Sequence, residues 1–150
     1  MKVSDILRVK GNVLYTLGPD HTLWSAVETM AEHDIGSVVV MENGQMVGLL
    51  TFREIINTIH HNGGQIGSGT IRSAMDRDPQ TVTPHTDVNE VRRLMIERHV
   101  RYVPVLDGGT LAGVISFYDV AKAVLEEQGL ENQMLKAYIR DWPEQESVSG

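Results

Sequence analysis

Apolar positions recur along this chain with helical spacing, and the same spacing occurs twice. Leu23, Ala26, Val27 and Met30 lie at positions i, i+3, i+4 and i+7, the spacing of one face of an amphipathic helix. A second stretch repeats the pattern with Val88, Val91, Leu94 and Met95. The pattern predicts helices over 22–33 and 87–98, and the segments after the next hairpins predict helices over 51–60 and 117–127.

Strand signals surround each of these helices. A short apolar stretch precedes each helix, at 12–17 and at 80–83. After the first helix, two β-rich runs flank Asn43-Gly44, a strong hairpin signal, and Asp107-Gly108-Gly109 occupies the same place in the second copy. Each copy is therefore predicted to be a β-α-β-β-α unit, so the fold class is α/β.

A shift of 65 residues aligns the two copies without a gap and superposes Pro19 on Pro84, Gly48 on Gly113 and Phe52 on Phe117. Two copies are too few for a solenoid, so we expect a pseudo-symmetric pair that buries one shared core. The predicted organisation is a first motif at 1–61, a glycine-rich linker at 62–70, a second motif at 71–127 and an extra C-terminal helix with a tail at 128–150. The linker is not followed by a Gly-Lys-Ser/Thr sequence, so it is a weak candidate for a phosphate loop.

Composition narrows the possible functions. The 150 residues include no cysteine, which excludes disulfides, zinc–thiolate sites and a thiol nucleophile. A net charge of −7 argues against broad nucleic-acid binding. The first residues form neither a signal peptide nor a membrane span, so we expect a cytoplasmic protein that does not contact a membrane.

One short sequence motif occurs twice, once in each copy, and it allows two interpretations. Thr51 is followed three residues later by Glu54, and Ser116 by Asp119, which is the pattern of a helix capping box. A helix N-terminus with a free hydroxyl and an acid one turn on also suits a nucleotide, because its N–H groups attract phosphate and the acid can accept bonds from a ribose diol. The two interpretations are compatible.

These residues carry a resemblance to a known family. The stretches Ile35–Val40 and Gly48–Ile55, with their counterparts Val100–Val105 and Gly113–Val120, resemble a tandem pair of cystathionine-β-synthase (CBS) domains, also called a Bateman module. The resemblance covers residues 3–126 and looks like stand-alone bacterial CBS-pair proteins. It implies a non-catalytic regulatory module with no required cofactor and no metal, whose ligand is AMP, ADP or ATP, or alternatively NAD(H) or S-adenosylmethionine.

The resemblance also implies two ligand clefts, each built from both copies. The expected nucleotide-binding residues of one cleft are Ser116, Tyr118, Asp119, Thr16, Leu17, Ile35 and Gly36. Those of the other are Thr51, Arg53, Glu54, Thr83, Val100 and Arg101. The second cleft departs from the family pattern at Glu54, where aspartate is usual, so ribose binding is less expected there. Val39 in place of Pro104 is the other departure.

Other interpretations of the sequence remain. The sequence His33-Asp34-Ile35-Gly36 resembles the His-Asp pair of metal phosphohydrolases, but it falls where a helix meets a strand. A purely structural dimerisation module, in which the doubled phrase only caps helices, is the alternative function. We expect a homodimer formed by the four main helices, with an unidentified regulated protein as a possible further partner. Apolar residues at 130, 134 and 138 predict the extra helix, ended by Pro143.

Overall fold

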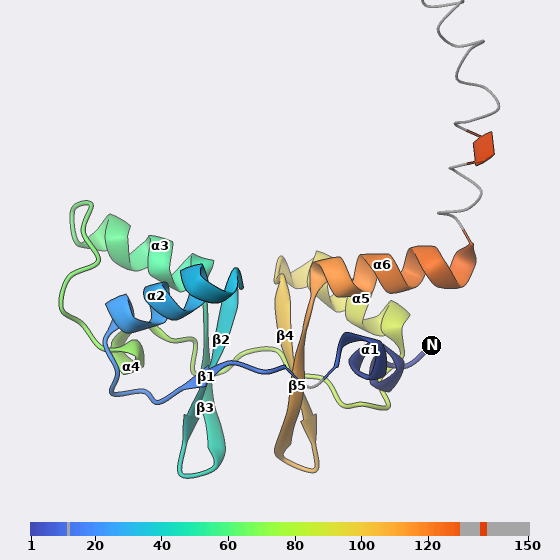
Figure 1. Cartoon of the computed structure of the whole chain (residues 1–150), viewed down its shortest axis with the longest axis horizontal. Coiled ribbons are helices and arrows are strands. Elements are labelled where there is room, and N and C mark those ends of the chain that lie inside the picture. The colour runs from blue at the N-terminus through green and yellow to red at the C-terminus, as the bar shows by residue number, and fades with distance from the viewer. Residues whose placement is uncertain (12, 130–135, 138–150) are drawn as a thin grey trace, which may run out of the picture.

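The computed structural model describes residues 1–11, 13–129, 136 and 137 (Figure 1). Within this part of the chain, two similar halves lie side by side, each with a β-hairpin and a pair of helices. The elements are α1 (Val3–Lys10), β1 (Thr16–Leu17), α2 (Leu23–His33), β2 (Ser37–Glu42), β3 (Gln45–Thr51), α3 (Phe52–His61), α4 (Ile71–Ala74), α5 (Val88–Arg98), β4 (Tyr102–Asp107), β5 (Thr110–Ser116) and α6 (Phe117–Gln128).

The first half contains a three-stranded sheet in the order β1-β2-β3, in which β1 is parallel to β2 and β3 is antiparallel to it. The predicted turn at Asn43-Gly44 is confirmed. Both residues have positive φ angles, 54° and 76°, which the tight hairpin turn requires. The hairpin places Thr51 at the end of β3, directly before α3.

The second half repeats the hairpin with β4 and β5, but its leading strand is reduced to one bridge between Val82 and Val105. In the first half, the Val39 N–H donates to the Tyr15 carbonyl, 3.3 Å away. Pro104 occupies the aligned position in β4 and has no N–H to donate. The same ladder bond cannot form, which explains the shorter pairing.

The prediction of one shared core is wrong, because the buried residues form two clusters, one on the helical side of each hairpin. The halves meet instead along β3 and β5. Leu49 of β3 is 4% exposed without belonging to either cluster, and Val39 of β2 is 1% exposed. Each sheet therefore buries one face under its own helices and turns the other toward the neighbouring half.

The two halves exchange their leading segments. Val3 and Ile6 of α1 pack in the cluster of the second half, although they open the first repeat in sequence. Ile71 and Met75 pack in the cluster of the first half. Main-chain bonds fix both exchanges. The Val88 N–H donates to the Met1 carbonyl over 3.0 Å, and the aligned Leu23 N–H donates to the Gly69 carbonyl over the same distance.

The four predicted helices are confirmed, and no end differs from its predicted position by more than one residue. In α2 and α5, most residues of the predicted apolar stripes are buried, including Leu23 and Met95, whereas Val27 and Leu94 are partly buried. The predicted extra helix falls mostly on residues outside the described part of the chain. Gly129 ends α6 with a φ of 67°, in the left-handed region that glycine tolerates.

Candidate functional site

The start of α6 presents a polar group made by its own capping box. The Asp119 N–H donates to Ser116 Oγ over 3.1 Å, and the Ser116 N–H donates to Asp119 Oδ2 over 2.8 Å. Among the described residues, the Ser116 hydroxyl donates no hydrogen bond of ordinary length, although it lies near enough to the Asp119 carboxylate to contribute to its lowered pKa. The Ser116 hydroxyl is therefore available to donate to a ligand at the positive end of the helix.

The start of α3 uses the aligned residues differently. Glu54 Oε1 accepts both the Thr51 N–H, over 2.7 Å, and the Thr51 hydroxyl, over 2.8 Å. The longer glutamate side chain folds back far enough to reach both donors. In this half the hydroxyl proton is already used, so Thr51 offers a ligand less than Ser116 does.

A hollow of about 810 Å³ opens beside the start of α6, and we call it the Ser116 cleft. Its volume lies in the range of small-molecule sites, roughly 300–1,000 Å³. Both copies line it. The walls come from Lys10, the segment Val13–Tyr15, the turn and strand residues Asp34–Ser37 and Val39, the start of β4 at Arg101 and Tyr102, and Val114, Ser116–Tyr118 and Ala121. Most of these walls are apolar, which suits an aromatic base.

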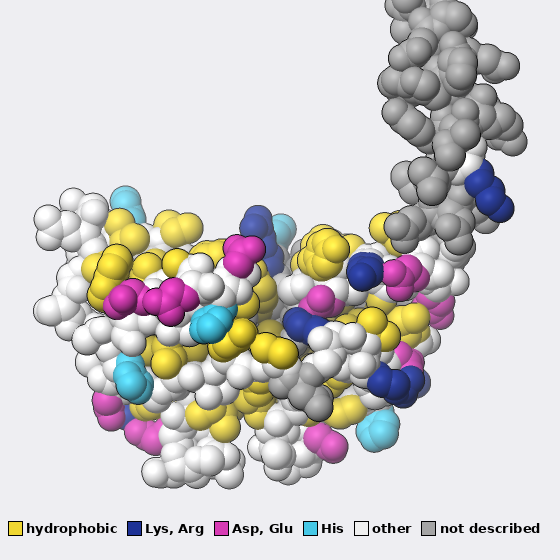
Figure 2. Space-filling view, in the orientation of Figure 1, with side chains coloured by type: hydrophobic (Ala, Val, Ile, Leu, Met, Phe, Trp, Pro, Cys, Tyr) yellow, Lys and Arg dark blue, Asp and Glu magenta, His cyan; other side chains and the backbone are white. Residues whose placement is uncertain are grey.

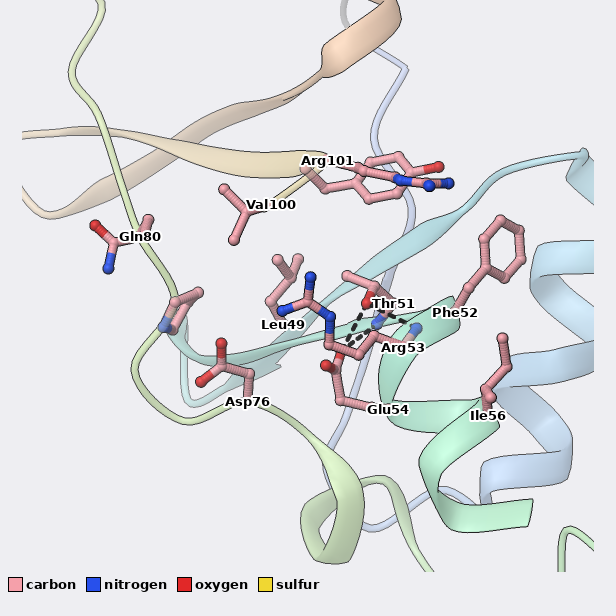
Figure 3. A pocket seen from close by; sticks show the side chains of 12 residues that line it. Leu49, Thr51, Phe52, Arg53, Glu54, Ile56, Asp76, Gln80, Val100 and Arg101 are labelled. Carbon is pink, nitrogen blue, oxygen red and sulfur yellow. Dashed lines mark hydrogen bonds between the residues drawn. The ribbon is translucent and has the colours of Figure 1, made fainter. Parts of the chain in front are cut away.

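A smaller hollow of about 290 Å³ opens beside the start of α3, and we call it the Thr51 cleft. Figure 3 shows Thr51, Arg53 and Glu54 on one side of it and Val100 and Arg101 across from them. The Arg53 guanidinium donates to the His99 carbonyl and so joins the two halves. Two arginines and the carboxylates of Glu54 and Asp76 make this cleft more charged than the Ser116 cleft.

Arg101 and Tyr102 line both clefts. The Tyr102 ring reaches across to the first copy at Gly36, where a Cβ atom would lie 1.8 Å from the Tyr102 hydroxyl oxygen. Gly36 is therefore required for space, and Tyr102 is a wall that the two clefts share.

Asp119, next to the Ser116 cleft, has a carboxyl group with a perturbed pKa. Partial burial raises its pKa, but hydrogen bonds from Lys10 and from the Ser116 backbone, with the charge of Lys10, outweigh burial. The pKa of Asp119 therefore lies below its ordinary value, and the carboxyl is ionised at neutral pH. An ionised carboxylate is the form that accepts hydrogen bonds from hydroxyl groups.

The structure brings most of the expected site residues together. Ile35, Gly36, Ser116 and Tyr118 line the Ser116 cleft, and the Asp119 carboxylate bonds to two of its lining residues, Lys10 and Ser116. The expected set of the other cleft also assembles, as Thr51, Arg53, Glu54, Val100 and Arg101. Their roles in binding a ligand stay predictions.

Four expected residues lie outside the walls of the clefts: Thr16, Leu17, Thr83 and Asp119. Asp119 lies next to the Ser116 cleft and contacts its wall through Lys10 and Ser116. Thr16 and Leu17 form β1 and pair with β2, so the residues just before them, Val13–Tyr15, face the Ser116 cleft instead. In the second copy, Pro79 and Gln80 take the corresponding place in the Thr51 cleft.

Sequence reasoning missed Lys10 and the helix that carries it. Val3, Ile6 and Leu7 have i, i+3, i+4 spacing, and Gly11 follows the helix with a φ of 89°. That spacing, followed by glycine, could have predicted α1. The position of Lys10 beside Asp119, across 109 residues of sequence, could not have been found from local pattern.

The motif at 33–36 has a structural explanation. His33 ends α2 and stacks on Tyr15 with ring centroids 4.1 Å apart, and Asp34 ends the helix with a φ of 52°. In the described part of the chain, no three His, Asp or Glu side chains gather as metal ligands would.

Comparisons with known proteins agree with this architecture. The sequence profile of the CBS domain matches residues 3–61 and 71–126. This chain belongs to the CBS-domain family. It is 31% identical over 147 residues to the CBS domain-containing protein CBSX3, mitochondrial, of Arabidopsis thaliana, and the match covers 92% of this chain and 71% of that protein.

Solved structures show the same fold. The CBS-domain protein ATU1752 from Agrobacterium tumefaciens superposes with a TM-score of 0.78 at 31% identity, covering 82% of this chain and 98% of that one. Two more distant CBS structures contain ligands. CBSX2 in complex with AMP has a TM-score of 0.73 at 20% identity, and it covers 85% of this chain and 98% of its own. The MJ0100 CBS pair with 5-methylthioadenosine and S-adenosyl-L-methionine has a TM-score of 0.74 at 22% identity, with the same coverage.

No helix among the described residues has the length and apolar character needed to cross a membrane. The cytoplasmic location and the homodimer stay predictions.

Proposed function

We propose that this CBS pair is a non-catalytic regulatory module that binds an adenine nucleotide, with AMP as the first ligand to test, in the Ser116 cleft. The observation that carries the proposal is the polar group at the start of α6. The Ser116 hydroxyl and the ionised Asp119 carboxylate lie one helical turn apart at a helix N-terminus, beside a largely apolar hollow. A nucleotide has matching groups: a phosphate for the N-terminus, a ribose diol for the carboxylate and a base for the apolar wall.

The Thr51 cleft is a weaker candidate for the same ligand. It is smaller, its hydroxyl already bonds to Glu54, and it carries Arg53 in addition to the Arg101 that both clefts share. These features favour a more highly charged group, such as the phosphates of ADP or ATP, over a nucleoside. The fold is shared with proteins that bind AMP, or 5-methylthioadenosine and S-adenosyl-L-methionine, which all contain an adenosyl group. A panel of AMP, ADP, ATP, NAD(H) and S-adenosylmethionine therefore covers the candidates.

Replacement of Asp119 tests this proposal. Loss of a charged acceptor typically costs about 1.5–3 kcal/mol, so Asp119→Ala should weaken AMP binding roughly ten- to a hundredfold or more in calorimetric titration. AMP at a hundredfold excess over its dissociation constant should stabilise the wild-type fold by about 2.7 kcal/mol. ATP should bind without being hydrolysed.

Asp5 provides a matched control. It takes the same position in α1, where its Oδ2 accepts the Lys2 N–H over 2.9 Å, but its partners Lys2 and Arg8 line neither cleft, whereas the partners of Asp119 line the Ser116 cleft. Asp5→Ala should lower stability without changing affinity for AMP. Unchanged AMP affinity in a folded Asp119→Ala protein would contradict the proposed site.

A structural dimerisation module is the second candidate, favoured by a specific observation. Both acids complete capping boxes that stabilise their helices without any ligand. A cap typically contributes about 1 kcal/mol, which is enough to explain the doubled phrase. This alternative predicts that Asp119→Ala and Glu54→Ala lower stability, and that no compound of the panel shifts the melting temperature.

A further inference from the structure

Lys10 forms an ion pair with Asp119, whose carboxylate the proposed ligand would also bind. Lys10 ends α1, and its Nζ lies 2.7 Å from Asp119 Oδ2 and 2.9 Å from the Val114 carbonyl oxygen. The Asp119 side chain is 17% exposed, and that of Lys10 is 36% exposed. The ammonium group thus sits at the wall of the Ser116 cleft, between β5 and the first turn of α6.

The two oxygens of Asp119 are unequally used. Oδ2 accepts the Ser116 N–H and the Lys10 ammonium, which matches the two lone pairs of a carboxylate oxygen. Within the described part of the chain, Oδ1 meets no donor. A ribose diol donates two adjacent hydroxyl groups and binds a carboxylate best through both oxygens. Oδ2 can accept one of them only if Lys10 leaves.

The first half shows what is unusual about this contact. Leu49 aligns with Val114, and its carbonyl accepts the Asp76 backbone N–H over 2.9 Å. In the first half, a fixed main-chain amide donates to this carbonyl. In the second half, the ammonium group of Lys10 donates to the aligned carbonyl instead. Glu54, the counterpart of Asp119, bonds to Thr51 and to no lysine or arginine among the described residues. Of the two aligned acids, only Asp119 forms an ion pair with a flexible lysine side chain in the described part of the chain.

We propose that Lys10 is a built-in competitor for the ligand of the Ser116 cleft, and that its ammonium group must release Asp119 before a ribose diol can bind through both carboxylate oxygens. This inference rests on the proposed function. The ion pair is then an autoinhibitory contact, because the free energy needed to break it lowers the affinity for the ligand. Lys10 can swing away by rotating its own side chain, while α1 stays in place through Val3 and Ile6.

Adenosine is the sharpest probe, because it has the diol but no phosphate for a lysine to attract. Replacing Lys10 by methionine keeps the length of the stem and removes the charge. Ion pairs near a surface contribute about 0.2–1 kcal/mol, so Lys10→Met should bind adenosine about 1.4- to fivefold more tightly than the wild type. Salt screens the ion pair, so added salt should improve adenosine binding to the wild type and leave Lys10→Met unaffected. A merely structural role would not produce this difference in salt response.

Lys122→Met is the matched control. Lys122 is an exposed lysine on α6 outside the walls of the Ser116 cleft, and its replacement removes the same charge. Its adenosine affinity should equal that of the wild type.

The possible results separate this inference from the proposed function. Equal or weaker adenosine binding by Lys10→Met overturns the inference, and weaker binding makes Lys10 a direct ligand contact. If AMP binds all three proteins but adenosine binds none, the inference fails and the proposed function stands. If neither compound binds any of the three proteins, both fail.

Discussion

Replacement of Gly36 by alanine should disturb the wall that the two clefts share. Gly36 precedes β2 and is buried, and its φ lies outside the left-handed region, so space is its constraint. An added Cβ would lie 1.8 Å from the Tyr102 hydroxyl oxygen and 2.5 Å from its Cζ. The start of the first sheet thus fits against a side chain of the second copy.

The expected loss of stability in Gly36→Ala follows from this steric overlap. Ordinary contact begins at 3.4 Å, so the Tyr102 hydroxyl would have to retreat by about 1.6 Å. Overpacking of this kind typically costs about 1–3 kcal/mol. In a Tyr102→Ala background the Tyr102 obstacle is absent, but Phe52 Cε2 would still lie 2.8 Å from the added Cβ. Gly36→Ala should therefore cost less there than in the wild type, without becoming neutral. We therefore expect a coupling energy of about 1–2 kcal/mol, within the range observed for residues in contact.

Urea denaturation of the two single variants, the double variant and the wild type measures this coupling. Gly18→Ala is the control. Its φ is also outside the left-handed region, and its Cβ would come no closer than 3.4 Å to His21, so its effect should be small. Additive effects of Gly36→Ala and Tyr102→Ala would refute the reasoning, because they would mean that the two residues do not compete for space.

Two further predictions concern assembly and pH. Large apolar side chains are exposed on the helical side of both halves (Figure 2), and Ile56 and Ile96 are 63% and 57% exposed. We expect a homodimer through this side, so Ile56→Glu with Ile96→Glu should give a monomer in sedimentation, whereas Val9→Glu on α1 should not. The lowered pKa of Asp119 means that its charge stabilises the fold above the ordinary carboxyl pKa of about 4, and that this contribution is lost as pH falls through the lowered value. The difference in unfolding free energy between wild type and Asp119→Asn should therefore shrink below about pH 4, and a difference that grows on acidification would contradict this assignment.

Local pattern was sufficient for the repeated unit. Apolar residues at helical spacing and the Asn43-Gly44 turn act through neighbours in sequence, so the helices and hairpins could be predicted from them. The capping residues Thr51 and Ser116 act locally too, and both helices begin directly after them. The resemblance to CBS pairs then indicated which residues of opposite copies would face each other.

The exchanged segments could not be predicted in the same way. Val3 and Ile71 bury their side chains against the repeat to which they do not belong in sequence. An amphipathic stripe shows that a helix needs an apolar partner, but it does not say which of two similar cores supplies it. The contact between Lys10 and Asp119 depends on that exchange, so it was missed along with α1.

One methylene group accounts for much of the chemical difference between the clefts. The internal repeat fixes nearly the same backbone at the start of α3 and α6, with an N-cap hydroxyl and an acid three residues on in each. Glu54 accepts the hydroxyl proton of its own N-cap residue over 2.8 Å, whereas the shorter Asp119 accepts the backbone N–H of Ser116 at close range and also the Lys10 ammonium. If Lys10 is displaceable as proposed, the shorter acid differs from a simple helix cap, because it pairs with a cation that a ligand can replace.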